Sequence, residues 1–596
     1  MKMNVLKNAL AILLFSGGLM ACSSGKKVTY YEQHLTFPEG ATLDQKLDMA
    51  SRLIPSPQQL QWQQLELTAF IHFGVNTFTN REWGDGTEDP NVFNPVNLDT
   101  DQWVSTLKDA GFKMIILTAK HHDGFCLWPT ATTSHSVASS AWREGKGDVV
   151  ADLAQSCKKY GMKLGLYLSP WDRNHPTYGS GEAYNKVYVQ QLTELLTNYG
   201  KVDEVWFDGA NGEGPNGKKQ EYDWDAVLST IRRLQPNAVT AIMGTEVRWV
   251  GNESGLGRAT EWSSTILPPS ALKRSQEIEK RMGINAQTKD LGSRKMVEQA
   301  QEMFWYPSEV DVSIRPGWFF HENENPKSVE HLVDIYFQSV GMNSSLLLNI
   351  PPDRNGLLDA KDVAQIKAFG KYVKAFNESR VSVDEGWAKV ADQMATINLG
   401  ASQPFDAIML QEDITKGQRV ENFVVEAYAN GAWEKVAEGT TIGYKRILLT
   451  DSPIQAEKLR VTLTSVRGPV TELMLEAYKR PTLGSSSDAE TVNVLKPEED
   501  WQLCKGQDGF TKTILTKDAD GFCFFPNSEN TITNYELVQD GHTLVSGEFG
   551  NIKNNPIPQY IPFQKKVSGE VLLRFTNNSG TTVMPEQGQI GFYTNK

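Results

Sequence analysis

The hydrophobic pattern of the chain repeats one unit between about Phe70 and Gly370. Each unit has a short apolar run rich in β-branched or aromatic residues, a loop, an amphipathic segment of about 12 residues and a glycine. Such a unit is typical of a β-strand followed by an α-helix. Asp99 can cap the start of one such helix, and Gly111 can adopt the left-handed conformation at its end. Comparable helices are expected within Asp148–Gly161, Tyr184–Gly200 and Ser328–Gly341.

The repeat predicts about eight strands that alternate with helices. They are expected at Phe70–Phe73, Lys113–Ala119, Leu164–Leu168, Val205–Asp208, Ala238–Met243, Val247–Val250, Val310–Ile314 and Leu346–Asn349. Strands that alternate with helices pair in parallel, and about eight of them in ~300 residues indicate an α/β fold with a (β/α)8-like barrel. An open doubly wound sheet is the alternative. It needs a glycine-rich phosphate loop, and none of these strand ends carries G-x-G-x-x-G or G-x-x-x-x-G-K-[ST].

The pattern changes after a last predicted helix near Asp359–Ser379. Short strands such as Asn422–Tyr428 and Lys458–Leu463 then follow, separated by turns such as Asn430-Gly431, and this alternation is typical of a β-sandwich. A Ser-rich joint at Thr482–Ser487 precedes a further β-rich stretch. We therefore predict a catalytic barrel at residues 58–380, a β-sandwich at 381–480, and a second β-rich domain at 481–596, expected to be a sandwich with carbohydrate binding as its candidate role.

The N-terminal segment has the pattern of an export signal. Lys2 and Lys7 precede an apolar run, Ala9–Met20, which is too short to span a bilayer. The run ends in Leu-Met-Ala before Cys22 and resembles the lipobox of bacterial lipoproteins. The resemblance implies a signal peptide at residues 1–22, lipid attachment at Cys22, a tether and lead-in at 23–57, and a protein anchored in the bacterial envelope, in the periplasm or at the cell surface. A plain cleaved signal with an incidental cysteine is the alternative.

Composition and charge exclude several classes of function. Lys+Arg 59 against Asp+Glu 72 give a net charge of −13, the wrong sign for a nucleic-acid partner. The remaining cysteines, Cys126, Cys157, Cys504 and Cys523, are too few for a disulfide scaffold and lack C-x-x-C metal spacing, although Cys504 and Cys523 could pair across a hairpin. No H-E-x-x-H occurs, so we expect no catalytic metal and no cofactor.

Polar and aromatic residues follow the predicted strand ends, where a parallel barrel carries its reactive groups. This convergence of carboxylates, histidines and tryptophans is typical of a sugar pocket, with polar groups for hydroxyls and flat faces for C–H surfaces. His121 and His122 are adjacent and would point to opposite faces of a strand, so a shared metal is not expected and one of them could be structural. Asp208 could instead cap a helix.

Four segments form a more specific pattern, namely Phe70–Gly74, Glu82-Trp83, Leu117–Trp128 and Val205–Ala210. With its string K-H-H-D-G-F-x-x-W, this pattern resembles glycoside hydrolase family 29, the α-L-fucosidases. The resemblance covers about Gln58–Tyr372, and the C-terminal third matches only as a β-rich appendage. Val247–Gly255, Thr260–Ser263 and Arg315–His321 resemble the branch of the family that prefers α-1,3 and α-1,4 linkages, as in Lewis-type glycans.

The resemblance implies a retaining exo-α-L-fucosidase that acts through a covalent fucosyl-enzyme. Asp208 matches the nucleophile of the family. Retention needs a second carboxyl about 5 to 5.5 Å away as acid/base, and Glu253 and Glu261 are the two candidates. Glu253 is preferred because it follows a predicted strand directly, although it could instead fix Arg248 or a tryptophan.

The resemblance also assigns fucose binding to His72, Glu82, Trp83, His121, His122, Tyr167, Trp206 and Trp318. Histidines and Glu82 suit ring hydroxyls, and aromatic faces suit the C5 methyl group that separates fucose from galactose. Fucosylated oligosaccharides or glycoconjugates are the expected partners. Two alternatives stay open: a catalytically weak glycan-binding lipoprotein of a polysaccharide-uptake system, and a related α-L-glycosidase.

Overall fold

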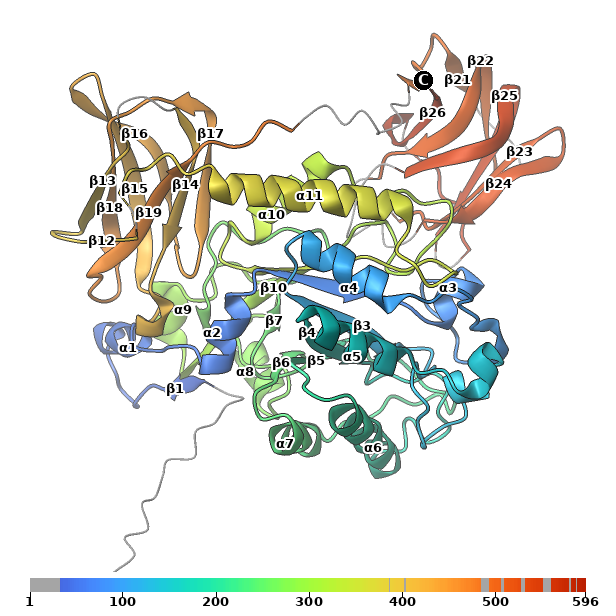
Figure 1. The fold of residues 1–596 in the computed structure, drawn as a ribbon, viewed down its shortest axis with the longest axis horizontal. Helices are drawn as coiled ribbons and strands as arrows, with labels where there is room; N and C mark the ends of the chain where they lie inside the picture. Colours follow the sequence, from blue (N-terminus) through green and yellow to red (C-terminus); the bar gives the residue numbers. More distant parts are fainter. Residues whose placement is uncertain are drawn as a thin grey trace, which may run out of the picture.

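The computed structural model describes residues 33–595 except 385, 401–403, 484–492, 505–508, 527–530, 550–558, 578–579 and 586. The predicted signal and Cys22 therefore lie outside the described residues. Figure 1 shows a central barrel, a β-sandwich beside it and a second β-domain over its other end, with α11 running between the two. Among the described helices, none is both long and apolar enough to cross a membrane.

Eight parallel strands form the barrel, and they correspond one to one with the eight predicted strands. They are β2 (Leu67–Ile71), β3 (Met114–Lys120), β4 (Lys163–Leu168), β5 (Glu204–Phe207), β6 (Val239–Ile242), β7 (Arg248–Trp249), β10 (Ser308–Ser313) and β11 (Ser345–Asn349). Their order is β6-β5-β4-β3-β2-β11-β10-β7, and a parallel bridge between Ala241 and Val247 joins the two ends of this row. The predicted (β/α)8-like barrel is confirmed.

Five barrel helices lie within a few residues of the predicted ranges, namely α4 (Thr100–Asp109), α5 (Val149–Tyr160), α6 (Glu182–Asn198), α10 (Val329–Ser339) and α11 (Ala360–Glu378). The short α3 (Val75–Thr79) and α7 (Trp224–Leu234) were not predicted. Asp99 caps α4 by accepting a hydrogen bond from the Gln102 backbone at 3.0 Å. Gly161 ends α5 with a φ of 67°, a left-handed conformation that glycine adopts without strain.

The alternation of strand and helix is interrupted once. Residues 243–247, which are all described, make a turn between β6 and β7 that is too short for a helix. A long insertion then separates β7 from β10 and contains β8 (Ser264–Thr265), α8 (Ser275–Met282), α9 (Arg294–Gln299) and β9 (Glu302–Trp305). β9 pairs with β8 and with β1 (His34–Thr36), and α1 (Leu43–Ala50) packs on the same small sheet, followed by α2 (Pro57–Gln63). The segment before the barrel is thus folded against the insertion.

Side chains of the barrel strands alternate between its interior and its helical shell. Val310, Val312 and Ile314 pack outward in the core between strands and helices. Phe70, Ile116, Tyr167, Trp206 and Leu347 share a separate buried cluster inside the ring. The same alternation brings strand-end side chains together at the C-terminal rim. The cluster around His72, Tyr167 and Asp208 is called the pocket below.

The domain after α11 is a two-sheet β-sandwich, as predicted. One sheet contains β12 (Trp387–Lys389), β19 (Glu472–Tyr478), β14 (Phe405–Gln411) and β17 (Arg446–Ile454), and the other contains β13 (Met394–Asn398), β18 (Lys458–Val466), β15 (Val420–Ala429) and β16 (Ala432–Gly439). Asn430 and Gly431 make the predicted turn with φ values of 53° and 84°. Lys445 pairs with Glu66 of the barrel at 2.6 Å, which ties the two domains together.

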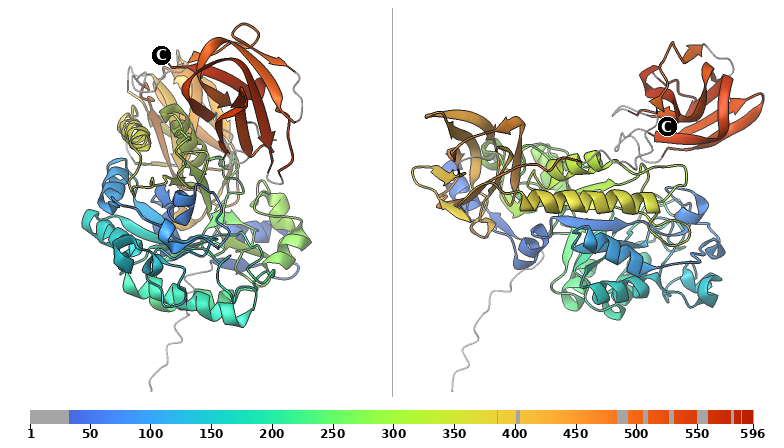
Figure 2. Two further views of the ribbon diagram at one scale, coloured as in Figure 1. Left: turned by 90° about the vertical axis from the view of Figure 1, so that its right-hand side faces the viewer. Right: turned by 45° about the horizontal axis from the view of Figure 1, so that its top comes forward.

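The C-terminal domain is one antiparallel sheet that curls around its own core, seen from two further sides in Figure 2. Its strands are β20 (Asn493–Val494), β21 (Trp501–Cys504), β22 (Thr511–Phe524), β23 (Asn534–Gln539), β24 (His542–Glu548), β25 (Gln559–Thr576) and β26 (Ile590–Thr594). Register shifts between Leu515 and Gly521 bend the long strand β22, which lets one sheet cover both sides of the core. Cys504 and Cys523 are free thiols, so the pairing considered from the sequence does not occur.

Candidate active site

Asp208 lies at the C-terminal end of β5 with its carboxylate in the pocket. Tyr167 donates a hydrogen bond to Oδ2 at 3.2 Å, and Oδ1 accepts one from the Ala210 backbone at 2.7 Å. Burial, together with the charge of Asp208, raises the pKa of Tyr167 well above its ordinary value, so the phenol keeps the proton that it donates. Asp208 does not cap a helix, because α7 begins only at Trp224 and is capped by Asp223.

His121 and His122 lie side by side on the pocket wall, with ring centroids 4.2 Å apart. The expectation that they point to opposite faces is wrong, because β3 ends at Lys120 and both histidines lie in the turn that follows. His122 Nδ1 is 2.7 Å from Ser169 Oγ, and Ser169 gives its own proton to the Trp171 carbonyl at 2.6 Å. His122 must therefore donate from Nδ1, and its Nε2, 3.7 Å from Asp208 Oδ2, carries a lone pair.

The same reasoning defines the protonation of His72. Asn349 Oδ1 accepts hydrogen bonds from the His72 backbone at 3.2 Å and from its Nδ1 at 2.9 Å, so Nε2 is again the acceptor. Burial is the main cause that lowers the pKa of His72 to about 4, and it lowers the pKa of His121 and His122 as well. These imidazoles are neutral at neutral pH and suit hydroxyl groups that donate hydrogen bonds.

An apolar wall faces the histidines. Tyr167 stacks on Trp206 at 5.2 Å, Phe70 lies 5.1 Å from Trp206, and Trp318 lies 5.1 Å from His72. Phe70 was not among the binding residues predicted from the sequence. Its position two residues before His72 on β2 was a usable signal, because alternate residues of a strand share a face.

Glu82 holds the loop that carries Trp318. Its carboxylate accepts hydrogen bonds from the backbone of Trp318 at 2.8 Å and of Phe319 at 3.1 Å, and it pairs with His321 Nε2 at 2.7 Å. Glu82 thus holds Trp318 in place at the pocket wall. This role is additional to the fucose binding that the resemblance implies. The neighbouring Trp83 is 53% exposed and stands edge-on to His122 at 5.5 Å, which leaves a flat face at the mouth of the pocket.

The remaining residues of the K-H-H-D-G-F string form the support of the histidines. Lys120 is fully buried and pairs with Asp172 at 3.1 Å, pointing away from the pocket. Asp123 accepts a hydrogen bond from the Phe125 backbone at 2.7 Å and closes the turn. Gly124 in the same turn has a φ of +83°, and a Cβ atom there would overlap the carboxylate of Asp172.

Replacing Gly124 with alanine is therefore expected to lower the free energy of unfolding by about 2 to 4 kcal/mol, through backbone strain and a steric clash. Chemical denaturation measures this change. Gly111→Ala is the matched control, because it shares a positive φ of 92° but has open space around the added carbon. Equal losses in both variants would contradict the role of close packing against Asp172.

The two acid/base candidates lie in different surroundings. Glu253 is half-buried on the loop that follows β7, and its charge acts on Asp311 in the C-terminal half of β10. Glu261 is buried in an ion pair with Arg248 and with Arg258, the latter at 3.2 Å. Its main chain is bonded to Thr441 and Gln418 of the sandwich at 2.9 Å each. Glu261 therefore lies at the interface between barrel and sandwich, whereas Glu253 lies on a strand-end loop.

Within the described residues, no group of three or more His, Cys, Asp or Glu side chains is placed to hold a metal ion. We predict that EDTA leaves the rate of hydrolysis unchanged, since every reacting group proposed below is an organic side chain. Rates measured after extended dialysis against the chelator check this prediction. A loss of activity that an added divalent ion restores would contradict it.

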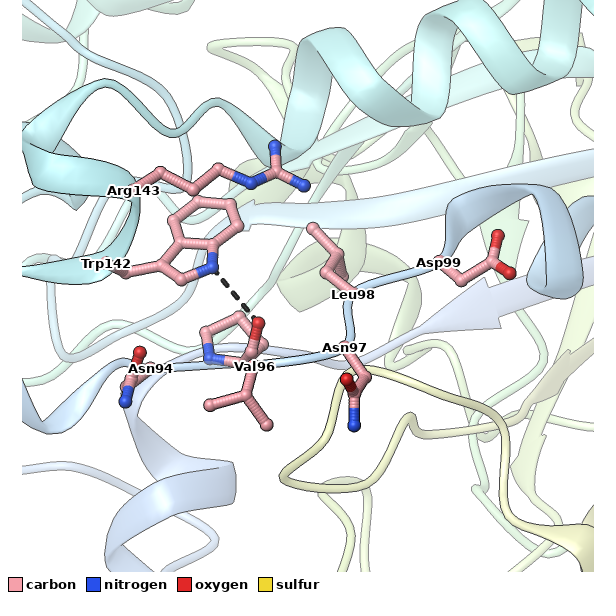
Figure 3. A pocket seen from close by; sticks show the side chains of 8 residues that line it. Asn94, Val96, Asn97, Leu98, Asp99, Trp142 and Arg143 are labelled. Carbon is pink, nitrogen blue, oxygen red and sulfur yellow. Dashed lines mark hydrogen bonds between the residues drawn. The ribbon is translucent and has the colours of Figure 1, made fainter.

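A shallow groove of about 520 Å³ opens elsewhere on the barrel, between the segment Asn94–Asp99 and the pair Trp142 and Arg143 (Figure 3). Trp142 donates to the Pro95 carbonyl at 3.0 Å, and the Arg143 guanidinium lies 4.5 Å over its ring. Gly147 packs against another part of the same indole. Because the ring is already covered, the groove offers no free aromatic face for a sugar.

A parallel barrel whose strand ends bring together carboxylates, hydroxyl-accepting imidazoles and aromatic faces belongs to the class of sugar-processing barrel enzymes. The sequence model of the alpha-L-fucosidase family matches residues 49–378, and that of the F5/8 type C domain matches residues 372–475, over the sandwich. Alpha-L-fucosidase 1 of Arabidopsis thaliana is 40% identical over 76% of this chain and 92% of its own.

Solved structures agree with these matches. A candidate alpha-L-fucosidase from Bacteroides ovatus is 52% identical, covers 94% of this chain and 99% of its own, and has a TM-score of 0.75. A Ruminococcus gnavus family 29 fucosidase in complex with fucose is 32% identical, covers 72% of this chain and 95% of its own, and has a TM-score of 0.63. The chain belongs to glycoside hydrolase family 29, the alpha-L-fucosidases. It is a glycoside hydrolase that acts on fucosylated substrates.

Proposed function

We propose that the protein is a retaining exo-α-L-fucosidase that removes α-1,3- and α-1,4-linked fucose from Lewis-type glycans. The observation that carries the mechanism is the placement of Asp208 in the pocket between Tyr167 and His122, with Glu253 on the strand-end loop that follows β7. The ion pair that buries Glu261 favours Glu253 as the acid/base.

The reaction proceeds in two displacements. Asp208 attacks the anomeric carbon while Glu253 gives its proton to the departing glycosidic oxygen, and a covalent fucosyl-enzyme forms. Glu253 then takes a proton from water, which attacks the same carbon and releases Asp208. The hydrogen bonds from Tyr167 and the Ala210 backbone hold the carboxylate of Asp208 in one orientation, which reduces the reorganisation needed for the attack.

Recognition of fucose follows from the two sides of the pocket. The Nε2 atoms of His72 and His122 accept hydrogen bonds from sugar hydroxyls, since their Nδ1 atoms already donate to Asn349 and Ser169. The half-buried Trp318 beside His72, backed by the buried Phe70, offers an apolar surface to the C5 methyl group. A sugar with a hydroxymethyl group there would leave its hydroxyl without a partner, which disfavours α-L-galactosides.

The loop after Trp83 supports narrow linkage specificity. Glu88 accepts hydrogen bonds from the backbone of Asp85 at 2.7 Å and of Gly86 at 3.0 Å, and Asp85 accepts one from Thr87 at 2.9 Å. These bonds hold a compact polar turn beside the exposed Trp83, on the side where the remainder of the glycan would leave the pocket. A fixed turn of this kind can accept one branch geometry and exclude another.

Fucose release by residues 23–596 from Lewis a and Lewis x trisaccharides, an α-1,2-fucosyl lactose and an aryl α-L-fucoside tests this function. Release mainly from the Lewis sugars is expected. Equal cleavage of all the sugars would contradict the linkage preference and leave the family unaffected. Binding of fucosides without cleavage would favour a glycan-capture protein instead.

The proposal extends to location: Cys22 carries a lipid that anchors the enzyme in the bacterial envelope. The positively charged start, the apolar run and the small residues before Cys22 support it. Cys22→Ala is expected to move the enzyme from the membrane fraction to the soluble fraction of the cells that produce it. An unchanged distribution would contradict lipid anchoring at this residue.

A further inference from the structure

Three buried carboxylates inside the barrel each accept a hydrogen bond from a tryptophan indole at 2.8 Å. The pairs are Trp62 with Glu204, Trp206 with Glu309, and Trp249 with Asp311. An indole N–H is a neutral donor, so none of these bonds cancels the charge of an ionised carboxylate. These three carboxylates, called the column below, lie in a low-dielectric interior, where neighbouring members interact strongly.

Asp311 is the member of this column nearest to the proposed acid/base. Glu309 and Asp311 are two residues apart on β10 and share its inner face, and Glu309 is opposite Trp249 of β7 in the parallel register. Asp311 is the next inward-facing residue toward the C-terminal rim and is 5% exposed. At this level the chain has already left β7, which ends at Trp249, and leads to Glu253. The Trp249 indole thus links Asp311 to the strand from which the Glu253 loop departs.

The groups around Asp311 make its charge unfavourable. Burial, and then the charges of Glu253 and Glu309, raise the pKa of Asp311 well above its ordinary value, and the Trp249 hydrogen bond opposes this shift. On its other side, β11 contributes the apolar Leu347 in register. Two carboxyls that repel in this way bind protons as a pair, and the pair keeps its last proton to a higher pH than a lone carboxyl does.

We propose that Asp311 is a positioning residue for the acid/base, and that Asp311 and Glu253 hold one proton between them. This inference rests on the proposed role of Glu253. In the first displacement the shared proton passes from Glu253 to the glycosidic oxygen as the bond to the anomeric carbon breaks and the bond to Asp208 forms. In the second, Glu253 takes a proton from water, and the repulsion by Asp311 makes it a stronger base.

The test compares pH profiles of kcat/KM for phenyl and 4-nitrophenyl α-L-fucosides, whose leaving oxygens differ in their need for a proton. Asp311→Asn keeps the shape of the side chain and an acceptor for Trp249 but removes the negative neighbour. The upper limb of a profile is the range on its alkaline side where kcat/KM falls as the acid loses its proton. For the phenyl fucoside, this limb is expected to move to lower pH by about one unit or more. The upper limb for the 4-nitrophenyl fucoside is expected to move less.

Two further variants sharpen the test. Glu204→Gln removes an equally buried, indole-bonded carboxylate at the far end of the column, and its profile is expected to match that of the wild type. Trp249→Phe removes the indole N–H, which stabilises the ionised form of Asp311, so the upper limb is expected to move to higher pH. This opposite direction keeps the inference testable if Asp311→Asn does not fold.

Glu253→Gln, measured in parallel, separates the two proposals. If Glu253→Gln lowers the rates on both fucosides by the same factor, the proposed role of Glu253 fails. If it lowers the phenyl fucoside rate more, while the upper limb of Asp311→Asn stays at the wild-type pH, only the role of Asp311 is overturned. Two other results would overturn the inference. If Asp311→Asn loses phenyl fucoside hydrolysis at every pH, Asp311 is itself the acid. If Glu204→Gln shifts the pH profile as much as Asp311→Asn does, the effect belongs to the column in general.

Discussion

Replacing Asp208 with asparagine is expected to lower kcat by about 10⁴-fold or more, whereas the affinity for fucose changes by less than about tenfold. The amide can keep the hydrogen bond from Tyr167 and the place of the side chain, but it cannot form the covalent bond to the anomeric carbon. Steady-state rates on an aryl α-L-fucoside and calorimetric titration with fucose measure the two effects.

A matched control is available on the loop that follows. Asp223 caps α7 by accepting a hydrogen bond from the Ala226 backbone at 3.1 Å, and asparagine caps helices about as well as aspartate. Asp223→Asn should therefore keep the wild-type rate. Azide adds a stereochemical check: Asp208→Ala with azide should release the inverted β-L-fucosyl azide. A near-normal rate in Asp208→Asn would remove Asp208 from the role of nucleophile.

The second large effect is expected at Glu253. Glu253→Gln should lower hydrolysis of an oligosaccharide by about 10² to 10⁴-fold, and that of an aryl fucoside with a good leaving group by much less, because only the first needs a proton on the departing oxygen. The ratio of the two rates measures the loss of general acid catalysis. Glu253→Ala with azide should yield the retained α-L-fucosyl azide, since the anion then attacks the fucosyl-enzyme.

Glu261→Gln serves as the matched comparison and should behave differently. Removing its charge leaves the buried Arg248 without its full partner, and breaking such a pair reduces stability by about 3 to 5 kcal/mol. We expect a lower melting temperature with an unchanged ratio of the two rates. If Glu261→Gln changes that ratio and Glu253→Gln does not, the acid/base role moves to Glu261.

The barrel could be predicted because its signals are local. Apolar runs such as Val310–Ile314 and caps such as Asp99 with Gly111 depend on neighbours within a few residues, and each lies where the sequence places it. The insertion between β7 and β10 was not predicted. Its small sheet joins β9 to β1, more than two hundred residues apart, and the sequence does not signal such a pairing.

Within the site, residue types were predictable but their relations were not. His121 and His122 face the same pocket because β3 ends at Lys120, so the alternation of a strand does not extend to them, and strand ends are weakly encoded. Along the chain, Glu253 and Glu261 differ only in their distance from a predicted strand. The fold separates them further, because Arg248, Arg258 and the sandwich surround Glu261.

The sequence alone determines the order of strands and helices, because backbone propensity, capping and side-chain alternation act over a few residues. It also determines the family, which short motifs carry. The distribution of charge inside the barrel required the folded molecule. The burial of Glu261 comes from contact between barrel and sandwich, whereas the neutral state of His72 and the interaction of Asp311 with Glu253 come from groups that barrel closure brings together. Desolvation and Coulomb energies depend on those distances and not on the order of residues in the chain.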